Sequence, residues 1–492
     1  MGEKMPHWLT KQADLSPDEV AIETKDGDSL TFSELKINSQ RFAQQLASIG
    51  VDKGTHVGIL SSNHQTMMIA LHAISYLGAV AVLLNTRLTR SELQYQVDDG
   101  DVAIVIAADS YYEKALELQV KRVISYSDIG RLSKKVVHLQ EELDLDDVYT
   151  IMYTSGTTGF PKGVIHTYGN HWWSAIGSAL NLGVDKHDKW LTVLPMFHVG
   201  GLSILIRSVI YGIPVYLLDK FDVQEVLEAI IHKKVSIVSV VTVMLQQIVA
   251  NIGEYRFPDT FRCMLLGGGP APTALLEKAK AHHIPVFQSY GMTETSSQIV
   301  TLAPKDALAK IGSAGKSLFP AQLKVVTEKP GQIGDIFVKG PMVTSGYYKK
   351  PTATEKAIKN GWLATGDLGY LDKDGYLYIA DRRKDLIISG GENIYPSEIE
   401  NILSELADIQ EVGVIGQENE QWGEVPVAFI VREKKEVTKE NIYAFANTRL
   451  ARYKVPKEIF FVDELPRNAS NKLLRWKLKE LLEDPTIHNH TK

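Results

Sequence analysis

Residues 153–163 read Tyr-Thr-Ser-Gly-Thr-Thr-Gly-Phe-Pro-Lys-Gly and follow an apolar stretch that predicts a strand. Glycines let the backbone approach a ligand, while hydroxyls, amides and an ammonium donate hydrogen bonds to phosphate oxygens. The spacing differs from the Gly-x-x-x-x-Gly-Lys-Ser/Thr of P-loop proteins, which argues against a GTPase or a motor. A phosphate-binding loop is therefore predicted, with candidate residues Thr154, Ser155, Gly156, Thr157, Thr158 and Lys162.

Short apolar runs separated by helix-length segments lie on both sides of this loop, a pattern typical of parallel strands joined by crossover helices. The predicted strands are 57–60, 79–84, 103–107, 190–194, 215–218, 235–240, 264–266 and 286–288. Asp26-Gly27 predicts a hairpin turn, and Thr31-x-x-Glu34 and Thr89-x-x-Glu92 predict capped helix starts. The two series of strands favour two layered α/β subdomains.

The pattern changes after about residue 312, where glycine-rich alternating stretches predict a β-rich region with an Asp-Gly hairpin over 370–378. From Asp385 onward a mixed α+β pattern follows, with predicted helices at 396–405 and 439–450. We therefore predict an α/β protein of two domains. A large N-terminal domain, 1–383, would combine layered α/β subdomains with the β-rich region, and a small α+β domain would span 384–492.

Composition excludes several classes of function. The chain has 53 basic and 59 acidic residues, a formal charge of -6 and no dense basic block, so a nucleic-acid partner is not expected. The single cysteine, Cys263, excludes an internal disulfide and a multi-cysteine zinc site, and its apolar neighbours predict an inert buried thiol. No apolar run approaches the roughly 20 residues that span a bilayer, and the N-terminus lacks the apolar core of a signal peptide. We expect a cytoplasmic enzyme without membrane insertion.

Further polar segments follow the loop in order along the chain. They are Tyr290-Gly-Met-Thr-Glu294, Thr365-Gly-Asp367, Asp381-Arg-Arg-Lys-Asp385, Ser389-Gly-Gly-Glu-Asn-Ile-Tyr-Pro396 and Pro466-Arg-Asn-Ala-Ser-Asn-Lys472. With these segments the chain resembles, over almost its whole length, the adenylate-forming superfamily of acyl-CoA synthetases, firefly-type luciferases and nonribosomal-peptide adenylation domains. The resemblance implies an ATP-dependent enzyme that activates a small carboxylic acid as its adenylate and transfers the acyl group to a thiol.

The resemblance also implies which residues hold the nucleotide. Asp367 would bind the ribose hydroxyls, and Arg382 would reach the ribose and a phosphate. Tyr290 would lie against the adenine, while the backbone of Gly268 and Gly269 would approach the other face of the nucleotide.

Other matched residues would serve the reaction. Thr293 would contact the α-phosphate, and Glu294 would hold Mg²⁺ on the ATP phosphates, since hard oxygen ligands suit that ion. Lys472 matches the catalytic lysine, whose fixed positive charge would help one anion attack another. Asn471 stands where the family usually has glycine, and asparagine tolerates left-handed geometry, so the turn is expected to persist. Lys384 matches the hinge about which the mobile C-terminal domain would turn between the two half-reactions.

The acid pocket is predicted around 195–202, which resembles the family segment whose histidine, here His198, lines the acyl site. Ser289 and Gly291 are further candidates for contact with the substrate. Arg207 follows in an apolar predicted helix, where an unpaired buried charge is costly. It either pairs internally or reaches water, or it binds a second carboxylate on the substrate.

The thiol must come from outside the chain, because Cys263 lies in no nucleophile motif. Coenzyme A is favoured over the arm of a carrier protein, because no residues follow the small domain to form a fused carrier. Within the superfamily the chain is similar to CoA ligases that act on an aromatic keto-diacid in menaquinone biosynthesis. A ligase for another aryl or a medium-chain acid, an enzyme that loads a separate carrier protein, and a non-catalytic nucleotide sensor stay open as alternatives, as does a homo-oligomeric state.

Overall fold

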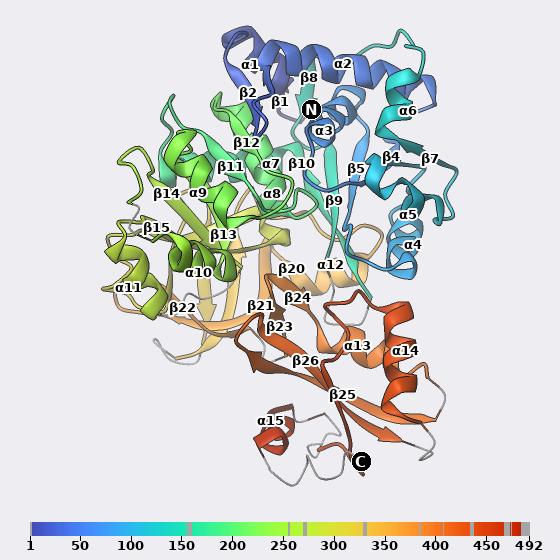
Figure 1. The fold of residues 1–492 in the computed structure, drawn as a ribbon, viewed down its shortest axis with the longest axis vertical. Coiled ribbons are helices and arrows are strands. Elements are labelled where there is room, and N and C mark those ends of the chain that lie inside the picture. The colour runs from blue at the N-terminus through green and yellow to red at the C-terminus, as the bar shows by residue number, and fades with distance from the viewer. Residues whose placement is uncertain are drawn as a thin grey trace.

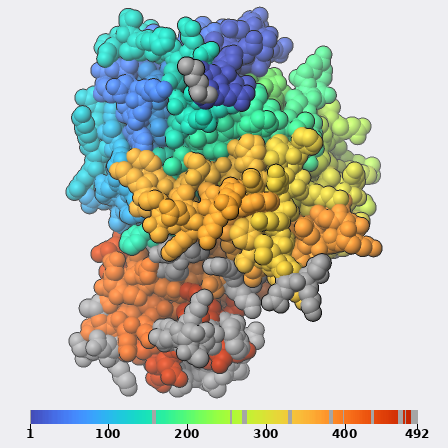
Figure 2. All heavy atoms as spheres, turned by 180° about the vertical axis from the view of Figure 1, so that it is seen from behind, coloured from blue at the N-terminus to red at the C-terminus, as the bar shows by residue number. Residues whose placement is uncertain are grey.

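The computed structural model describes residues 2–154, 160–253, 256–268, 273–327, 332–382, 385–406, 408–432, 437–466, 473 and 475–483. Figure 1 shows two unequal parts, with the chain from residue 385 onward gathered at one end of the molecule. We call this C-terminal part the small domain and the preceding residues the large domain. Figure 2 shows the same division from behind. Among the described helices none is both long and apolar enough to cross a membrane.

The first sheet of the large domain has the strand order β10-β9-β5-β4-β6-β7 within the described residues. Its strands are β4 (His56–Leu60), β5 (Val80–Leu84), β6 (Ile104–Ala107), β7 (Arg122–Ser125), β9 (Val148–Thr154) and β10 (Lys162–Thr167). β10 runs antiparallel to β9 and the other neighbours are parallel. The associated helices are α2 (Phe32–Ser48), α3 (Gln65–Leu77), α4 (Arg90–Asp99) and α7 (Tyr168–Leu182). Both predicted capping boxes are present, at the starts of α2 and α4.

The second sheet runs β18-β19-β21-β22-β17-β16-β15-β14-β13-β11-β12-β2-β3. Its α/β half contains β2 (Val20–Thr24), β3 (Ser29–Thr31), β11 (Trp190–Thr192), β12 (Val215–Leu217), β13 (Ile237–Val241), β14 (Cys263–Gly267) and β15 (Val286–Met292). The helices of this half are α8 (Val199–Tyr211), α9 (Val223–His232), α10 (Thr242–Asn251) and α11 (Thr273–Ala281). The predicted two series of strands with crossover helices are therefore confirmed.

The β-rich region predicted after residue 312 continues this second sheet. Its strands are β16 (Ser297–Leu302), β17 (Ser313–Ser317), β18 (Gln322–Val326), β19 (Gly334–Lys339), β20 (Ile358–Lys359), β21 (Trp362–Leu371) and β22 (Leu377–Arg382). β16 pairs with β17, and β17 pairs with β22, so hydrogen bonds run without a break from the parallel strands into the antiparallel ones. The predicted hairpin over 370–378 is confirmed as the turn between β21 and β22.

The small domain packs helices on a sheet of β23 (Ile387–Ser389), β24 (Glu392–Ile394), β25 (Ile409–Asn419), β26 (Gly423–Arg432) and β27 (Glu458–Phe461). The helices are α13 (Pro396–Leu403), α14 (Lys439–Arg449) and α15 (Arg475–Glu483). Buried side chains of α13 and α14 form one apolar cluster with the sheet, and Leu478 of α15 joins a second cluster. The sheet is therefore covered by helices and has its own core.

The fold directs several strand ends toward the small domain. β5, β9, β13 and β14 end at Leu84, Thr154, Val241 and Gly267, and the residues at or just after these ends line one cavity. In open α/β sheets ligands bind beyond the carboxyl ends of the strands, so the topology itself indicates where the site lies.

Candidate active site

A cavity of about 1620 Å³ lies where the two domains meet. It brings together most of the site residues predicted from the sequence, namely Thr154, Lys162, His198, Arg207, Gly268, Ser289, Gly291, Thr293, Glu294 and Asp367. The small domain contributes the loop Gly390–Asn393 to the same wall. Seven predicted residues lie outside the described part of the chain: Ser155, Gly156, Thr157, Thr158, Gly269, Lys384 and Lys472.

The carboxylate of Asp367 is held at one side of the cavity by its neighbours. It belongs to β21, is 4% exposed, and accepts a hydrogen bond of 2.6 Å from the hydroxyl of Tyr290. The Asp367 backbone N–H donates to Thr365 Oγ1 at 3.1 Å. Arg382 stands opposite Asp367 in the β21–β22 pairing, so the backbone places these two predicted nucleotide-binding residues side by side. Tyr290 thus helps to position the Asp367 carboxylate, which lines the cavity.

Thr293 and Glu294 form a short 3₁₀ turn whose backbone is fixed from two sides. The Thr293 carbonyl accepts a hydrogen bond from His166 Nε2 at 2.7 Å, and the Glu294 carbonyl accepts one from the Thr344 N–H at 2.8 Å. Burial lowers the pKa of His166 to about 4, so its ring is neutral and donates through Nε2 near pH 7. The two hydrogen bonds that hold the turn therefore come from neutral donors. The ionisable side chain of the turn itself is the carboxylic acid of Glu294.

Tyr347 links Glu294 to Lys162, a connection that the sequence did not indicate. The Tyr347 hydroxyl donates to Glu294 Oε1 at 3.0 Å, and burial raises the pKa of Tyr347, which keeps the phenol protonated. The Lys162 ammonium lies 5.2 Å from the centre of the same ring. Burial lowers the pKa of Lys162, whereas nearby Glu294 favours its charged form. Lys162, Glu294 and Tyr347 all line the cavity, so a cation and a carboxylate contact one aromatic side chain there.

The floor of the cavity depends on a close approach of β15 and β16. The pairing shifts register between Tyr290 and Gly291, and a Cβ atom on Gly291 would lie only 2.1 Å from the carbonyl oxygen of Ser297. Ser289, one residue before the shift, donates from Oγ to the Leu266 carbonyl at 3.0 Å. Glycine is required at 291 because any side chain would separate the two strands.

Arg207 is a buried cation in the cavity wall. It lies in α8, is 1% exposed, and donates from Nη2 to Ser297 Oγ at 3.2 Å. Its guanidinium carbon is 5.3 Å from the ring centre of Trp190, and its Nε has no hydrogen-bond partner among the described residues. No carboxylate among the described residues forms an ion pair with Arg207, and burial lowers its pKa. Since a desolvated guanidinium favours an anion, this part of the cavity can bind a carboxylate.

His198, at the N-cap of α8, lies beside a carboxylate that belongs to the other domain. Its Nε2 is 3.4 Å from Glu392, and Arg87 Nη1 is 2.7 Å from Glu392 Oε1. Burial alone would raise the pKa of Glu392, but His198, Arg87 and Lys454 outweigh it and lower that pKa to about 2. Sequence reasoning named His198 and missed its partner, although Glu392 stands inside the quoted 389–396 segment.

Comparisons with known proteins agree along nearly the whole chain. The AMP-binding enzyme family matches residues 9–348, and the AMP-binding enzyme C-terminal domain matches 398–472. The 2-succinylbenzoate–CoA ligase of Oceanobacillus iheyensis is 57% identical over 97% of this chain and 100% of its own length.

Two solved structures of o-succinylbenzoate CoA synthetase from Bacillus subtilis are similar to this chain to different degrees. A double mutant bound with its product analogue OSB-NCoA gives a TM-score of 0.93 at 46% identity, covering 97% of this chain and 99% of that one. The complex with ATP and magnesium ion gives 0.76 at 45% identity, covering 97% and 100%. Sequence identity and coverage are nearly the same in the two cases. The difference in TM-score therefore reflects a different spatial arrangement of the chain in the two solved structures.

The contact between Gly291 and Ser297 leads to a first prediction. Gly291→Ala should lower the stability of the large domain by about 1–3 kcal/mol, the usual cost of overpacking, and should weaken nucleotide binding by moving the 289–294 segment. Thermal unfolding and titration with ATP measure the two effects. Gly130→Ala is the matched control, because a Cβ there meets nothing within 4 Å. An unchanged melting temperature and ATP affinity in Gly291→Ala would show that the strands can separate without cost.

Proposed function

Because the chain belongs to the AMP-binding enzyme family, we propose that it is an ATP-dependent ligase that converts 2-succinylbenzoate and coenzyme A to 2-succinylbenzoyl-CoA. In the first half-reaction a carboxylate oxygen attacks the α-phosphorus of ATP, forms the acyl-adenylate and releases pyrophosphate. In the second the sulfur of coenzyme A attacks the acyl carbon, AMP leaves and the thiol proton passes to solvent. The product would serve menaquinone synthesis, and the need for ATP and coenzyme A favours the cytoplasm.

The residues around Asp367 and Glu294 support the nucleotide part of this proposal. Asp367 would accept hydrogen bonds from the ribose hydroxyls, and Lys162 with Thr293 would contact phosphate oxygens. Glu294 offers one hard oxygen ligand, and the described residues contain no group of three or more possible metal ligands. That sparse set suits Mg²⁺, which is usually held by one or two carboxylates together with substrate phosphates and water. Bound to ATP, the ion would neutralise phosphate charge.

The buried guanidinium of Arg207 is the observation that supports a diacid most directly. 2-Succinylbenzoate carries two carboxylates, and the one that is not activated would pair with Arg207 beside Ser297 and Trp190. A planar guanidinium can bind a carboxylate through two parallel hydrogen bonds, and the Arg207 Nε has no partner among the described residues. Gly291 and Ser289 would border the acyl group, and His198 would lie toward the side from which the thiol enters.

The arrangement of the two domains fits the second half-reaction. The higher TM-score belongs to the complex with a product analogue, and the lower one to the complex with ATP and magnesium. We infer that the small domain stands here in the placement for thioester formation, and that it turns about Lys384, at the proposed boundary between 1–383 and 384–492, to bring Lys472 into the cavity for adenylation.

The function is tested by pyrophosphate release with ATP and Mg²⁺ over a panel of mono- and dicarboxylic acids, followed by mass spectrometry of the thioester. We expect 2-succinylbenzoate to be the best acid, free coenzyme A to accept the acyl group, and chelation of Mg²⁺ to stop the reaction. Equal rates with benzoate or with medium-chain acids, or transfer only to a carrier protein, would contradict the proposal.

The pairing of Arg207 with the second carboxylate gives a second prediction. Arg207→Ala should raise KM for the diacid about 10- to 150-fold, the equivalent of losing a hydrogen-bonded ion pair worth roughly 1.5–3 kcal/mol, and leave KM for ATP nearly unchanged. The variant should also discriminate less against a monoacid that lacks the second carboxylate. Steady-state kinetics with both acids on the wild type and the variant give the interaction energy between the Arg207 side chain and the second carboxylate.

The control for this experiment is Arg262→Ala, because Arg262 is paired with Asp188, with 2.7 Å between Nε and Oδ1. That variant should lose stability without changing the preference between diacid and monoacid. If Arg207→Ala also loses equally with both acids, the guanidinium is structural and does not bind substrate.

A third prediction concerns Lys472, which matches the family's catalytic lysine. Lys472→Ala should slow adenylate formation on the order of 100- to 1,000-fold, the typical cost of removing one preorganised donor, and largely spare thioester formation from supplied acyl-adenylate. Rapid-quench assays of each half-reaction measure both rates. An equal loss in both would reject the assignment of Lys472 to the first half-reaction.

A further inference from the structure

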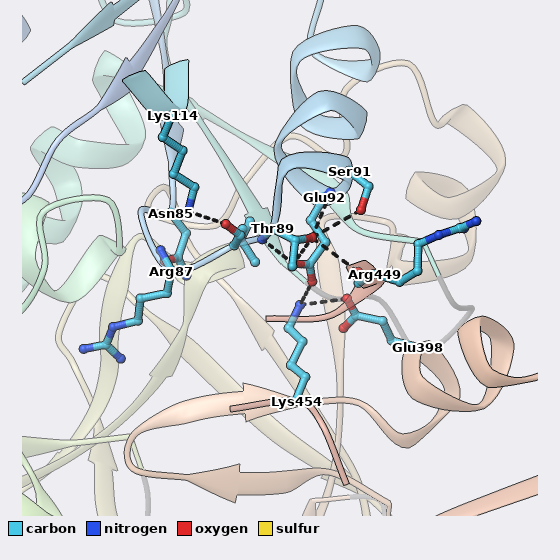
Figure 3. Close-up of polar contacts among 10 residues, drawn as sticks. Asn85, Arg87, Thr89, Ser91, Glu92, Lys114, Glu398, Arg449 and Lys454 are labelled. Atoms are coloured by element: carbon cyan, nitrogen blue, oxygen red, sulfur yellow. Dashed lines mark hydrogen bonds and ion pairs between the residues drawn. The ribbon is translucent and has the colours of Figure 1, made fainter. Parts of the chain in front are cut away.

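A buried lysine that lines the same cavity joins the two domains. Lys454 lies in the loop between α14 and β27 of the small domain and is 4% exposed. Its ammonium donates to Glu398 Oε1 of α13 at 2.7 Å and to Glu92 Oε1 of α4 at 2.9 Å. Figure 3 shows Glu398 and Glu92 pointing toward the ammonium from the small and the large domain. One of the two ion pairs therefore crosses the domain boundary.

The large-domain side of this bridge is rigid. Glu92 closes the capping box of α4, where its Oε2 accepts hydrogen bonds from the Thr89 backbone N–H and hydroxyl at 2.8 Å each, which leaves Oε1 directed at Lys454. The preceding loop is fastened by Lys114, whose ammonium donates to the Thr86 and Leu88 carbonyls. The capping box thus holds the Glu92 carboxylate through contacts that lie within the large domain.

Apolar contacts across the domain boundary accompany the bridge. Ala451 of the small domain is buried in a cluster with Leu88, Leu93 and Val97 of the large domain, and Tyr453 packs against the same cluster. The Thr89 hydroxyl also reaches the Arg449 carbonyl at 3.3 Å across the boundary. Two polar contacts, Lys454–Glu92 and Thr89–Arg449, thus cross the boundary beside an apolar contact, and all of them require the domain placement of this structure.

The Lys454–Glu398 pair lies within the small domain and the Thr89–Glu92 cap lies within the large one. Both can persist when the small domain turns, whereas the Lys454–Glu92 contact exists only in one relative placement. We propose that Lys454 is a positioning residue for thioester formation, holding the small domain against Glu92 in the placement seen here. This inference rests on the proposed two-step function and adds to it the contact that selects the second step.

Glu92→Gln is the test variant, because glutamine can keep the capping box while it removes the charge opposite Lys454. Thioester formation from supplied acyl-adenylate should fall about 10- to 150-fold, the equivalent of one hydrogen bond between charged groups, while adenylate formation stays near wild type. Glu34→Gln is the matched control, since Glu34 closes the same type of cap with Thr31 at the start of α2 and forms no domain contact. Lys454→Met should reproduce the selective loss, and combining it with Glu92→Gln should add little.

A distance measurement reports on the bridge independently of catalysis. Spin labels on Leu180→Cys in α7 and Ala444→Cys in α14 mark the two domains, and the native Cys263 is buried. Glu92→Gln should reduce the population with the inter-label distance of this structure, and Glu34→Gln should not. If Glu92→Gln matches Glu34→Gln in both the distances and the thioester rate, or slows both half-reactions equally, the proposal is overturned. If the wild-type enzyme forms no thioester, the proposed function is contradicted instead. The inter-label distances would still show whether the Lys454–Glu92 contact holds the two domains together.

Discussion

A positive charge buried without a described carboxylate partner is the constraint on which the acid end of the cavity depends. Transferring a guanidinium from water into an apolar wall is costly, and one hydroxyl from Ser297 together with the face of Trp190 offsets only part of that cost. In the proposed function the second carboxylate of the substrate would supply the missing interaction. The close approach of Gly291 to Ser297 keeps the hydroxyl in place for this arrangement.

The nucleotide end is built differently. Neutral donors, the imidazole of His166 and the phenols of Tyr347 and Tyr290, form hydrogen bonds to the Thr293 carbonyl and to the carboxylates of Glu294 and Asp367. In the proposed function Glu294 would hold a metal ion and Asp367 would bind the ribose hydroxyls. The small domain contacts the large one through Glu392 and Lys454. In the proposed function the cavity would combine a cationic end for the acid, a carboxylate for the metal ion and a wall formed by the small domain.

Local signals made much of the fold predictable. The Thr31 and Thr89 caps and the 370–378 hairpin depend on residues a few positions apart, and each formed where the sequence placed it. The joining of β17 to β22, and the pairing of β2 with β12, depend on partners far apart in sequence and could not be read from one chain. The same limit applies to the site. Asp367 and Glu294 stand in ordered motifs, whereas Tyr347 has no local signal, and the partners of Glu392 and Lys454 depend on how one domain rests on the other. The predictions for Ser155–Thr158, Gly269, Lys384 and Lys472 concern residues outside the described part and stay predictions.

Arg207 is proposed to bind the second carboxylate of a diacid. A crystal structure of the enzyme with 2-succinylbenzoate and a non-hydrolysable ATP analogue tests it most directly, because it locates both carboxylates at once. We expect one carboxylate toward the α-phosphate and the other within about 3 Å of the Arg207 guanidinium nitrogens, hydrogen-bond distance for a charged pair. A second carboxylate bound elsewhere, with Arg207 still in contact only with Ser297 and Trp190, would contradict it.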